Sequence, residues 1–74
     1  MKWRIILDEV SAKHGISVEA IKGRCLRRPT VAARWEAWAR IRTETRFSLR
    51  QIARLTGGFD HRAVNKACKK MGVA

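Results

Sequence analysis

Apolar side chains recur every three or four residues along most of the chain, with polar residues between them, and this pattern predicts helices. The first apolar stripe has the i, i+3, i+4, i+7 spacing of one helix face and consists of Trp3, Ile6, Leu7 and Val10. This helix should end near Gly15. No segment shows the strict alternation of a strand. We therefore expect an all-α fold, with residues 1–74 forming a single small bundle of about five helices.

A short helix and a loop are predicted next. Ser17 is a suitable N-cap for a helix that has Val18 and Ile21 on its apolar face and ends at Gly23. The segment that follows, residues 23–29, has the sequence GRCLRRP. Because it opens with glycine and closes with proline, it does not suit a helix interior, and we expect it to form a basic loop.

A long central helix is predicted after this loop. Pro29 suits its first turn, where the missing N–H is not needed for a helical hydrogen bond, and the apolar pattern continues to about Thr45. The buried face is expected to consist of Val31, Trp35, Trp38 and Ile41. Tryptophans can also stack on single-stranded bases, but the helical spacing of Trp3 and Trp38 favours the core.

Residues 48–71 have the local signals of two short helices joined by a turn. Ser48 and Gln51 have the spacing of a capping box, in which each side chain bonds the backbone N–H of the other. Phe47 and Ile52 stand at the positions of a hydrophobic staple, which fixes how the chain enters the helix. These signals predict a helix that starts directly after Ser48.

A second helix with the same kind of start follows two adjacent glycines. Gly57 and Gly58 supply the backbone freedom that a tight turn requires, and Asp60 is a suitable N-cap. The buried stripe of this helix is expected to consist of Val64, Ala67, Cys68 and Met71. Two short helices joined in this way are typical of a helix-turn-helix, whose second helix enters the major groove of DNA.

The distribution of charge favours a polyanionic partner. The formal net charge is +11, and residues 1–19 contribute nothing to it because their basic and acidic side chains balance. The whole excess therefore lies in residues 20–74. Nucleic acid is the first candidate for the partner. An anionic membrane surface is the second, because the apolar residues are already needed for a core.

Several other functions are disfavoured by the composition. Cys25 and Cys68 have no CxxC spacing, so we expect free thiols, without a disulfide or a metal site. No apolar run is long enough to span a membrane. The chain has no pair of acids or nucleophile and base at catalytic spacing, and no GxxxxGK[ST] phosphate loop. We therefore expect no enzymatic activity, no cofactor and no small-molecule substrate.

The first turn of the last helix supplies the candidate base contacts. Asp60, His61 and Arg62 fall there and should point outward. An arginine can donate two hydrogen bonds to guanine O6 and N7, and an aspartate can accept one from cytosine N4. Farther along the helix, Lys66 is placed to contact a phosphate. The alternative is a helical hairpin with a solvated basic face, in which Asp60 is only a cap.

Three consecutive segments, SLRQIARL, TGGFDHRAV and NKACKKM, are similar to a family signature: a serine-started helix, F-G-G-R-D-H-T-T-V, and an alanine followed by a basic pair. The family is the C-terminal DNA-binding domain, domain IV, of the bacterial replication initiator DnaA. Upstream, VSAKHGISVEAIKGR resembles its opening helices and PTVAARWEAWARIR its central helix. The resemblance covers residues 10–71 and implies a Trp-repressor-like fold and sequence-specific DNA binding.

The resemblance also implies roles for individual residues. Asp60, His61 and Arg62 match the residues with which the family contacts bases in the major groove. The basic loop matches the segment that enters the minor groove, with Arg27 and Arg28 as candidates. Phosphate contacts are implied for Arg34, Arg42, Ser48 and Arg50. The implied partner is double-stranded DNA, bound by a monomer, with tandem sites supplying any cooperativity.

Six residues depart from the family pattern at positions that bear on which DNA sequence is bound and on packing. Phe59 stands where the family has an arginine, and Arg62 and Ala63 stand where it has two threonines. Leu26 occupies the position that usually supplies the minor-groove arginine. Arg40 and Glu44 occupy positions in the central helix that are usually apolar. The preferred DNA sequence and the packing of this helix are therefore expected to differ from those of the family.

Three hypotheses for the function stay open at this point. The first is a sequence-specific DNA-binding protein without an ATPase, either a stand-alone regulator of replication or transcription or the DNA-binding module of an initiator. Met1 and the orderly first helix favour a complete short protein. The second hypothesis is non-specific binding of DNA or RNA, and the third is a protein-interaction domain that regulates an initiator or a polymerase. The expected location is the cytoplasm, in association with the nucleoid.

Overall fold

The structure, a computed structural model, describes residues 2–73 and contains helices in the order expected from the sequence. They are α1 (Lys2–His14), α2 (Val18–Lys22), α3 (Arg28–Glu44), α4 (Leu49–Leu55) and α5 (His61–Lys70). No strand occurs between residues 2 and 73, and the predicted all-α fold is confirmed. None of the helices in this range is long and apolar enough to cross a membrane.

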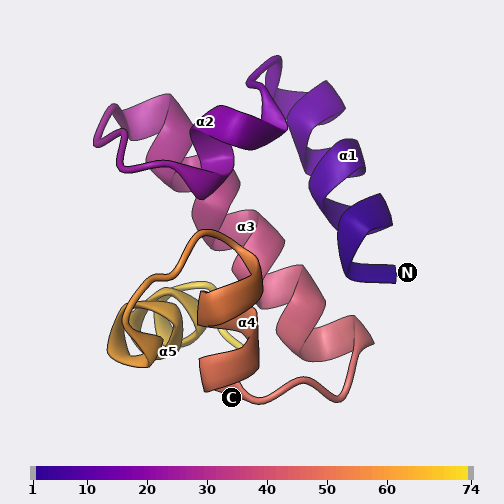
Figure 1. Cartoon of the computed structure of the whole chain (residues 1–74), viewed down its shortest axis with the longest axis vertical. Helices are drawn as coiled ribbons and strands as arrows, with labels where there is room; N and C mark the ends of the chain where they lie inside the picture. Colours follow the sequence, from indigo (N-terminus) through magenta and orange to yellow (C-terminus); the bar gives the residue numbers. More distant parts are fainter. Residues whose placement is uncertain (1, 74) are drawn as a thin grey trace.

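The central helix α3 packs against each of the other four helices. In Figure 1 it runs through the middle of the molecule, with α1 beside it, α2 above, and α4 and α5 together in the lower part of the view. The segment between α2 and α3, residues 23–27, is called here the α2–α3 loop. This loop and α5 both lie on the left side of Figure 1, so the fold presents them to the same side of the molecule.

The helix starts are formed by the local signals in the sequence. Ser17 caps α2 through its side chain. The capping box of α4 is complete, since the backbone N–H of Gln51 donates to the Ser48 hydroxyl at 3.2 Å and that of Ser48 donates to Gln51 Oε1 at 2.9 Å. At the start of α5, Asp60 accepts a 2.9 Å hydrogen bond from the backbone N–H of Arg62. These bonds satisfy N–H groups that have no partner inside the helices.

A single apolar core surrounds α3. Its largest fully buried members are Trp38, Ile6, Leu7, Ile21, Ile41, Ile52, Val10 and Val64. The Trp38 indole N–H donates to the Thr56 hydroxyl at 2.8 Å, and that hydroxyl donates to the carbonyl of Ile52 at 2.7 Å. Both polar groups are thereby satisfied inside the core, and α3 is tied to the end of α4.

The predicted buried face of α3 is only partly correct. Trp38 and Ile41 are buried, whereas Val31 and Trp35 are only half-buried. The buried face instead includes smaller and polar residues, namely Thr30, Ala33, Arg34 and Ala37. Alanines on the inner face let neighbouring helices approach α3 closely, whereas the sequence pattern favoured the larger side chains beside them.

The last helix is buried along most of its predicted stripe. Val64, Ala67 and Cys68 are buried, but Met71 is 46% exposed and the prediction for it is wrong. The reason is that α5 ends before Met71, so the stripe does not continue, and Val73 packs against the core instead. Cys25 is half-buried and Cys68 is buried, and both are free thiols.

The charged residues in the usually apolar positions of α3 form ion pairs at the surface. Arg40 contacts Glu9 of α1 at 2.7 Å and Glu44 at 2.9 Å, and these hydrogen bonds raise the pKa of Arg40. About a third of the Arg40 side chain is exposed. Solvated pairs of this kind typically contribute less than about 1 kcal/mol each, so they join α1 to α3 without taking part in the core.

Candidate nucleic-acid interface

The turn between α4 and α5 is closed by its own backbone. Gly57 and Gly58 have φ angles of 116° and 77°, in the region that favours glycine. The N–H groups of Gly58 and Phe59 both donate to the carbonyl of Ala53 at 3.0 Å. A Cβ on Gly57 would collide with the carbonyl oxygen of Lys22. The turn therefore packs directly against the end of α2, and there is no room for a side chain at position 57.

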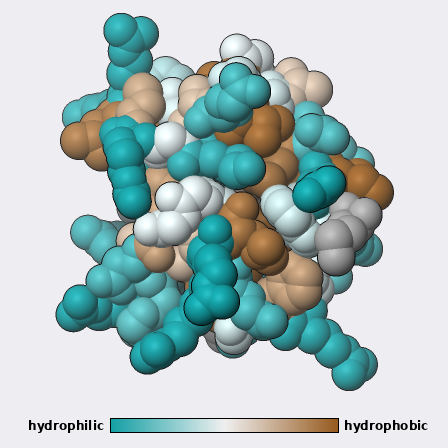
Figure 2. All heavy atoms as spheres, in the orientation of Figure 1, coloured by the Kyte–Doolittle hydropathy of each residue, from teal (hydrophilic) through white to brown (hydrophobic). Residues whose placement is uncertain are grey.

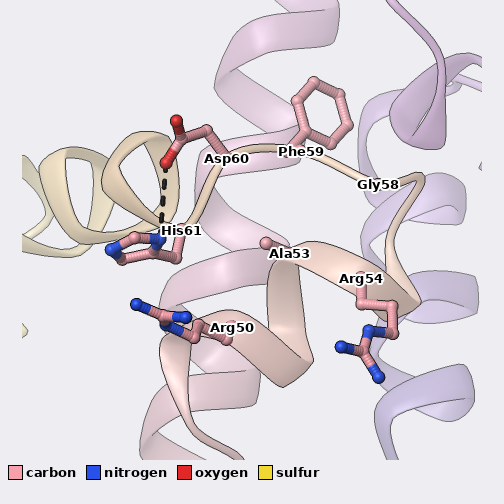
Figure 3. Close-up of a pocket in the computed structure, with 7 residues that line it drawn as sticks. All are labelled: Arg50, Ala53, Arg54, Gly58, Phe59, Asp60 and His61. Atoms are coloured by element: carbon pink, nitrogen blue, oxygen red, sulfur yellow. Dashed lines mark ion pairs between the residues drawn. The ribbon is translucent and has the colours of Figure 1, made fainter.

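The first turn of α5 brings together the three predicted base-contacting residues. Arg62 contacts Asp60 at 3.1 Å. His61 Nδ1 lies 3.4 Å from the same carboxylate, as Figure 3 shows. Hydrogen bonds from the Arg62 side chain and backbone lower the pKa of Asp60. The side chain of Arg62 is 82% exposed. A carboxylate, an imidazole and an exposed guanidinium thus stand side by side at the surface.

A shallow hollow lies between α4 and the start of α5 (Figure 3). Arg50 extends toward His61, whereas Arg54 extends away from it on the other side of the hollow. Arg50 was predicted to contact a phosphate, and Arg54 was missed. Its i+4 spacing from Arg50, which places residues on neighbouring parts of one helix surface, was the available signal. Two exposed guanidinium groups make the α4 side of this hollow strongly positive.

The outer face of α5 carries further positive charge. Lys66, the predicted phosphate contact on this helix, is exposed. It lines a second hollow together with Arg62, Asn65, Lys69 and Lys70. These residues recur at helical spacing, so the basic surface continues from the first turn of α5 to its end.

Two other predicted phosphate contacts flank the start of α4. Ser48 is exposed, and its hydroxyl oxygen already accepts the bond that caps the helix. Arg42 is half-buried and donates to the carbonyl of Phe47 at 2.9 Å. The Arg42 side chain therefore braces the connection between α3 and α4, close to the surface where α4 begins.

Arg34 does not occupy the position expected of a phosphate contact. Its side chain points inward and only 4% of the residue is exposed. The guanidinium donates to the carbonyl oxygens of Ile21 at 2.7 Å, Gly23 at 2.9 Å and Cys25 at 3.0 Å. Burial lowers the pKa of this group. The expectation was wrong because a chain of carbonyls that no helix satisfies can bind a guanidinium as well as a phosphate can, and the sequence does not show where those carbonyls lie.

Phe59, which stands in place of an arginine, joins the α2–α3 loop to the helix-turn-helix. Its ring packs edge-to-face on Trp38 with centroids 5.1 Å apart, and the guanidinium of Arg24 lies 4.5 Å from the ring centre. Arg24 also donates to the carbonyl of Gly58 at 3.1 Å. The contact fixes the loop relative to the turn before α5. Sequence reasoning missed Arg24, since nothing in its own neighbourhood indicates a partner 34 residues away.

The predicted minor-groove residues lie where this loop meets α3, with Arg27 at the end of the loop and Arg28 as the first residue of the helix. Arg27 and Arg28 are both exposed, and Arg27 is the N-cap residue of α3 without a capping hydrogen bond from its side chain. Leu26 beside them is 84% exposed. The loop thus presents an apolar side chain next to two guanidinium groups, on the side of the molecule where α5 lies (Figure 1).

Comparisons with known proteins agree with this geometry. The family described as "Bacterial dnaA protein helix-turn-helix" matches residues 4–71. The chain is 38% identical over 68 residues to the chromosomal replication initiator protein DnaA of Picosynechococcus, and 41% identical over 66 residues to that of Chloroflexus aggregans. The alignments cover 92% and 89% of this chain but only 15% and 14% of the two relatives. No solved structure matches the chain.

Proposed function

Because the chain belongs to the bacterial DnaA helix-turn-helix family, we propose that it binds double-stranded DNA with sequence specificity, at a site similar to the initiator box. The observation that supports this most directly is the exposed cluster at the start of α5. Asp60, His61 and Arg62 stand there on a basic surface, at the end of the helix that a helix-turn-helix inserts into the major groove.

The base contacts follow from the chemistry of the cluster. Arg62 has two parallel donors for guanine O6 and N7, and Asp60 accepts from cytosine N4. In the free protein these two side chains bind each other, so Asp60 holds the Arg62 guanidinium near the helix start before DNA arrives. His61 supplies a ring nitrogen beside them, as donor or acceptor according to its tautomer.

The remaining basic groups position the duplex. Arg50 and Lys66 lie on either side of the base-contacting cluster and contact phosphates, with Ser48 and Arg42 contributing at the start of α4. Arg27 and Arg28 contact the adjacent minor groove from the α2–α3 loop. Such contacts give affinity and register rather than sequence selection, and they make binding dependent on salt.

The protein acts in this proposal as a monomeric DNA-binding unit in the cytoplasm, associated with the nucleoid, and tandem sites supply cooperativity. It serves as a stand-alone regulator or as the DNA-binding module of an initiator. The chain spans about a seventh of the length of the relatives that it matches. Neither an ATPase activity nor a small-molecule substrate is part of the proposal.

Selection from a randomised duplex library at about 0.15 M salt tests the function, because weak phosphate-only binding is largely suppressed there. An enriched motif supports a specific DNA-binding protein. Enrichment of no motif contradicts the proposal and favours non-specific binding or a protein partner. Phe59 supports the alternative of non-specific binding. It replaces a positively charged residue of the family's helix-turn-helix with a ring that packs inward, on Trp38.

Substitution of Arg62 then tests the base contact. Arg62→Ala should weaken binding to the selected site by about 1–3 kcal/mol and relax the preference at one base position. Arg4→Ala, at another exposed arginine, on α1, is the matched control. It should change neither the affinity for the selected site nor the base preference. An equal loss on all duplexes would show that Arg62 meets a phosphate instead of a base.

A further inference from the structure

Leu26 is the most exposed of the large apolar side chains between residues 2 and 73. It is 84% exposed, compared with 55% for Ile5 and 46% for Met71. A scattered exposed leucine is ordinary on a protein surface, so exposure alone assigns no role. The setting of Leu26 is what distinguishes it, since arginines surround it in the sequence at positions 24, 27 and 28.

The loop that bears Leu26 is held rigidly from inside the protein. The buried guanidinium of Arg34 donates to the carbonyls of Gly23 and Cys25, the second of which directly precedes Leu26. Arg24 binds the carbonyl of Gly58 from the outer side. Burying a guanidinium is costly unless its donors are satisfied. Here that group fixes the backbone on which Leu26 is presented, so the leucine cannot fold back onto the core without breaking these bonds.

The position of the loop places it beside DNA. The Arg24–Gly58 contact ties it to the turn before α5, and loop and helix lie on the same side of the molecule (Figure 1). At the corresponding edge of Figure 2, apolar atoms reach the surface among hydrophilic side chains. If α5 enters the major groove as proposed above, the loop lies to one side of it, where the proposed function has the neighbouring minor groove.

We propose that Leu26 is a DNA-binding residue that inserts between base pairs from the minor groove and kinks the duplex. The proposal rests on the DNA-binding function proposed above. Leucine is among the apolar side chains that open a base step in this way, and the unstacking energy is offset by the contacts that the bent DNA makes. Arg27 and Arg28 contact the same groove beside it. Insertion favours steps that unstack easily, such as TA and CA, whereas an arginine favours a narrow A-tract groove.

A fluorescence experiment separates insertion from binding. The selected duplex carries 2-aminopurine at the step that faces the loop, and a donor–acceptor pair at its ends reports bending. Wild-type protein should raise the 2-aminopurine fluorescence and shorten the end-to-end distance. Leu26→Ala should abolish both signals while weakening binding about tenfold, which corresponds to about 1.4 kcal/mol. Because Leu26 lies outside the core cluster, this variant should melt at the wild-type temperature.

Matched variants complete the test. Leu26→Met keeps a long apolar side chain and should restore both signals, and Ile5→Ala, which removes an exposed apolar group on α1, should leave them unchanged. Leu26→Arg should bind without unstacking and prefer A-tract sites. Specific binding by wild type without unstacking, or unstacking that persists in Leu26→Ala, would overturn the insertion alone. Failure of wild type to bind any duplex would overturn the proposed function and the insertion with it.

Discussion

The helix-turn-helix and the α2–α3 loop face the same side of the molecule but are stabilised in different ways. The turn between α4 and α5 is closed by bonds between near neighbours, from Gly58 and Phe59 to Ala53. The loop is held by Arg34, which reaches back to carbonyls 9, 11 and 13 residues earlier in the chain. One element is formed by several local bonds, whereas several bonds of the other come from one distant side chain.

This difference predicts how each element responds to damage. Loss of one cap or one turn bond in the helix-turn-helix leaves the others in place, so the energetic cost should be small and local. Loss of Arg34 removes the bonds to the carbonyls of Ile21, Gly23 and Cys25 together. The substitutions below test this contrast in order of decreasing expected effect.

Arg34→Met should have the largest effect. The variant leaves the carbonyls of Ile21, Gly23 and Cys25 without their donor inside the protein, and unsatisfied buried groups of this kind cost about 1–3 kcal/mol each. We expect a loss of about 4 kcal/mol, measured by urea unfolding, with faster hydrogen exchange in the α2–α3 loop.

Arg40→Met on the same helix is the control for this substitution. Arg40 is bound only at the half-exposed surface, so its replacement should cost less than about 1 kcal/mol. Equal losses in the two variants would contradict the structural role of Arg34. If Arg34→Met loses little stability but reduces the salt dependence of DNA binding, Arg34 contacts a phosphate, as the sequence suggested.

The same contrast explains what could be predicted from the sequence. Residues within a few positions of one another encode each helix start and the glycine turn, so their patterns could be recognised directly. The helix starts are those at Ser17, Ser48 and Asp60. The inward position of Arg34 could not be recognised, because its partners are carbonyls whose location depends on how α2 packs on α3. The exposure of Met71 depends on where α5 ends, and that end has no sharp signal.

Gly57→Ala should have the second-largest effect, because this position is the exception to local control within the helix-turn-helix. The new methyl group would collide with the carbonyl of Lys22. The alanine would also have to adopt a positive φ angle, which only glycine adopts without strain. We expect a loss of about 3 kcal/mol in thermal or urea unfolding.

Gly58→Ala provides the comparison, since its φ angle is also positive but nothing lies within 4 Å of the added Cβ. It should cost about 1 kcal/mol, the backbone strain alone. The difference between the two variants measures the contact between the turn and α2. Equal costs would mean that α2 yields to the added methyl group and that the turn is controlled by backbone conformation only.

Ser48→Ala should have a smaller effect, typical of a single local signal. It removes the side-chain half of the α4 capping box and should cost about 1 kcal/mol. Ser48→Asn keeps a capping oxygen and should recover most of the stability. A loss of several kcal/mol in Ser48→Ala would contradict the view that the helix-turn-helix is held by many separable bonds.

The smallest effect should come from the charge of Asp60, which stabilises the fold at neutral pH and ceases to do so in acid. Hydrogen bonds from Arg62 lower the pKa of Asp60 in the folded state, so the carboxylate is favoured by folding. Its contribution is present above the ordinary aspartate pKa of about 3.9 and is lost as the pH falls through the lower folded value. Asp60→Asn, which retains a capping oxygen, should therefore be slightly less stable than wild type at neutral pH, and the difference should disappear in acid, so that the acid limb of the stability profile is flatter. An unchanged acid limb would mean that the Asp60–Arg62 pair is too well solvated to affect folding. In that case the pair only positions Arg62 for its base contact, and the start of α5 depends on hydrogen-bonding geometry alone.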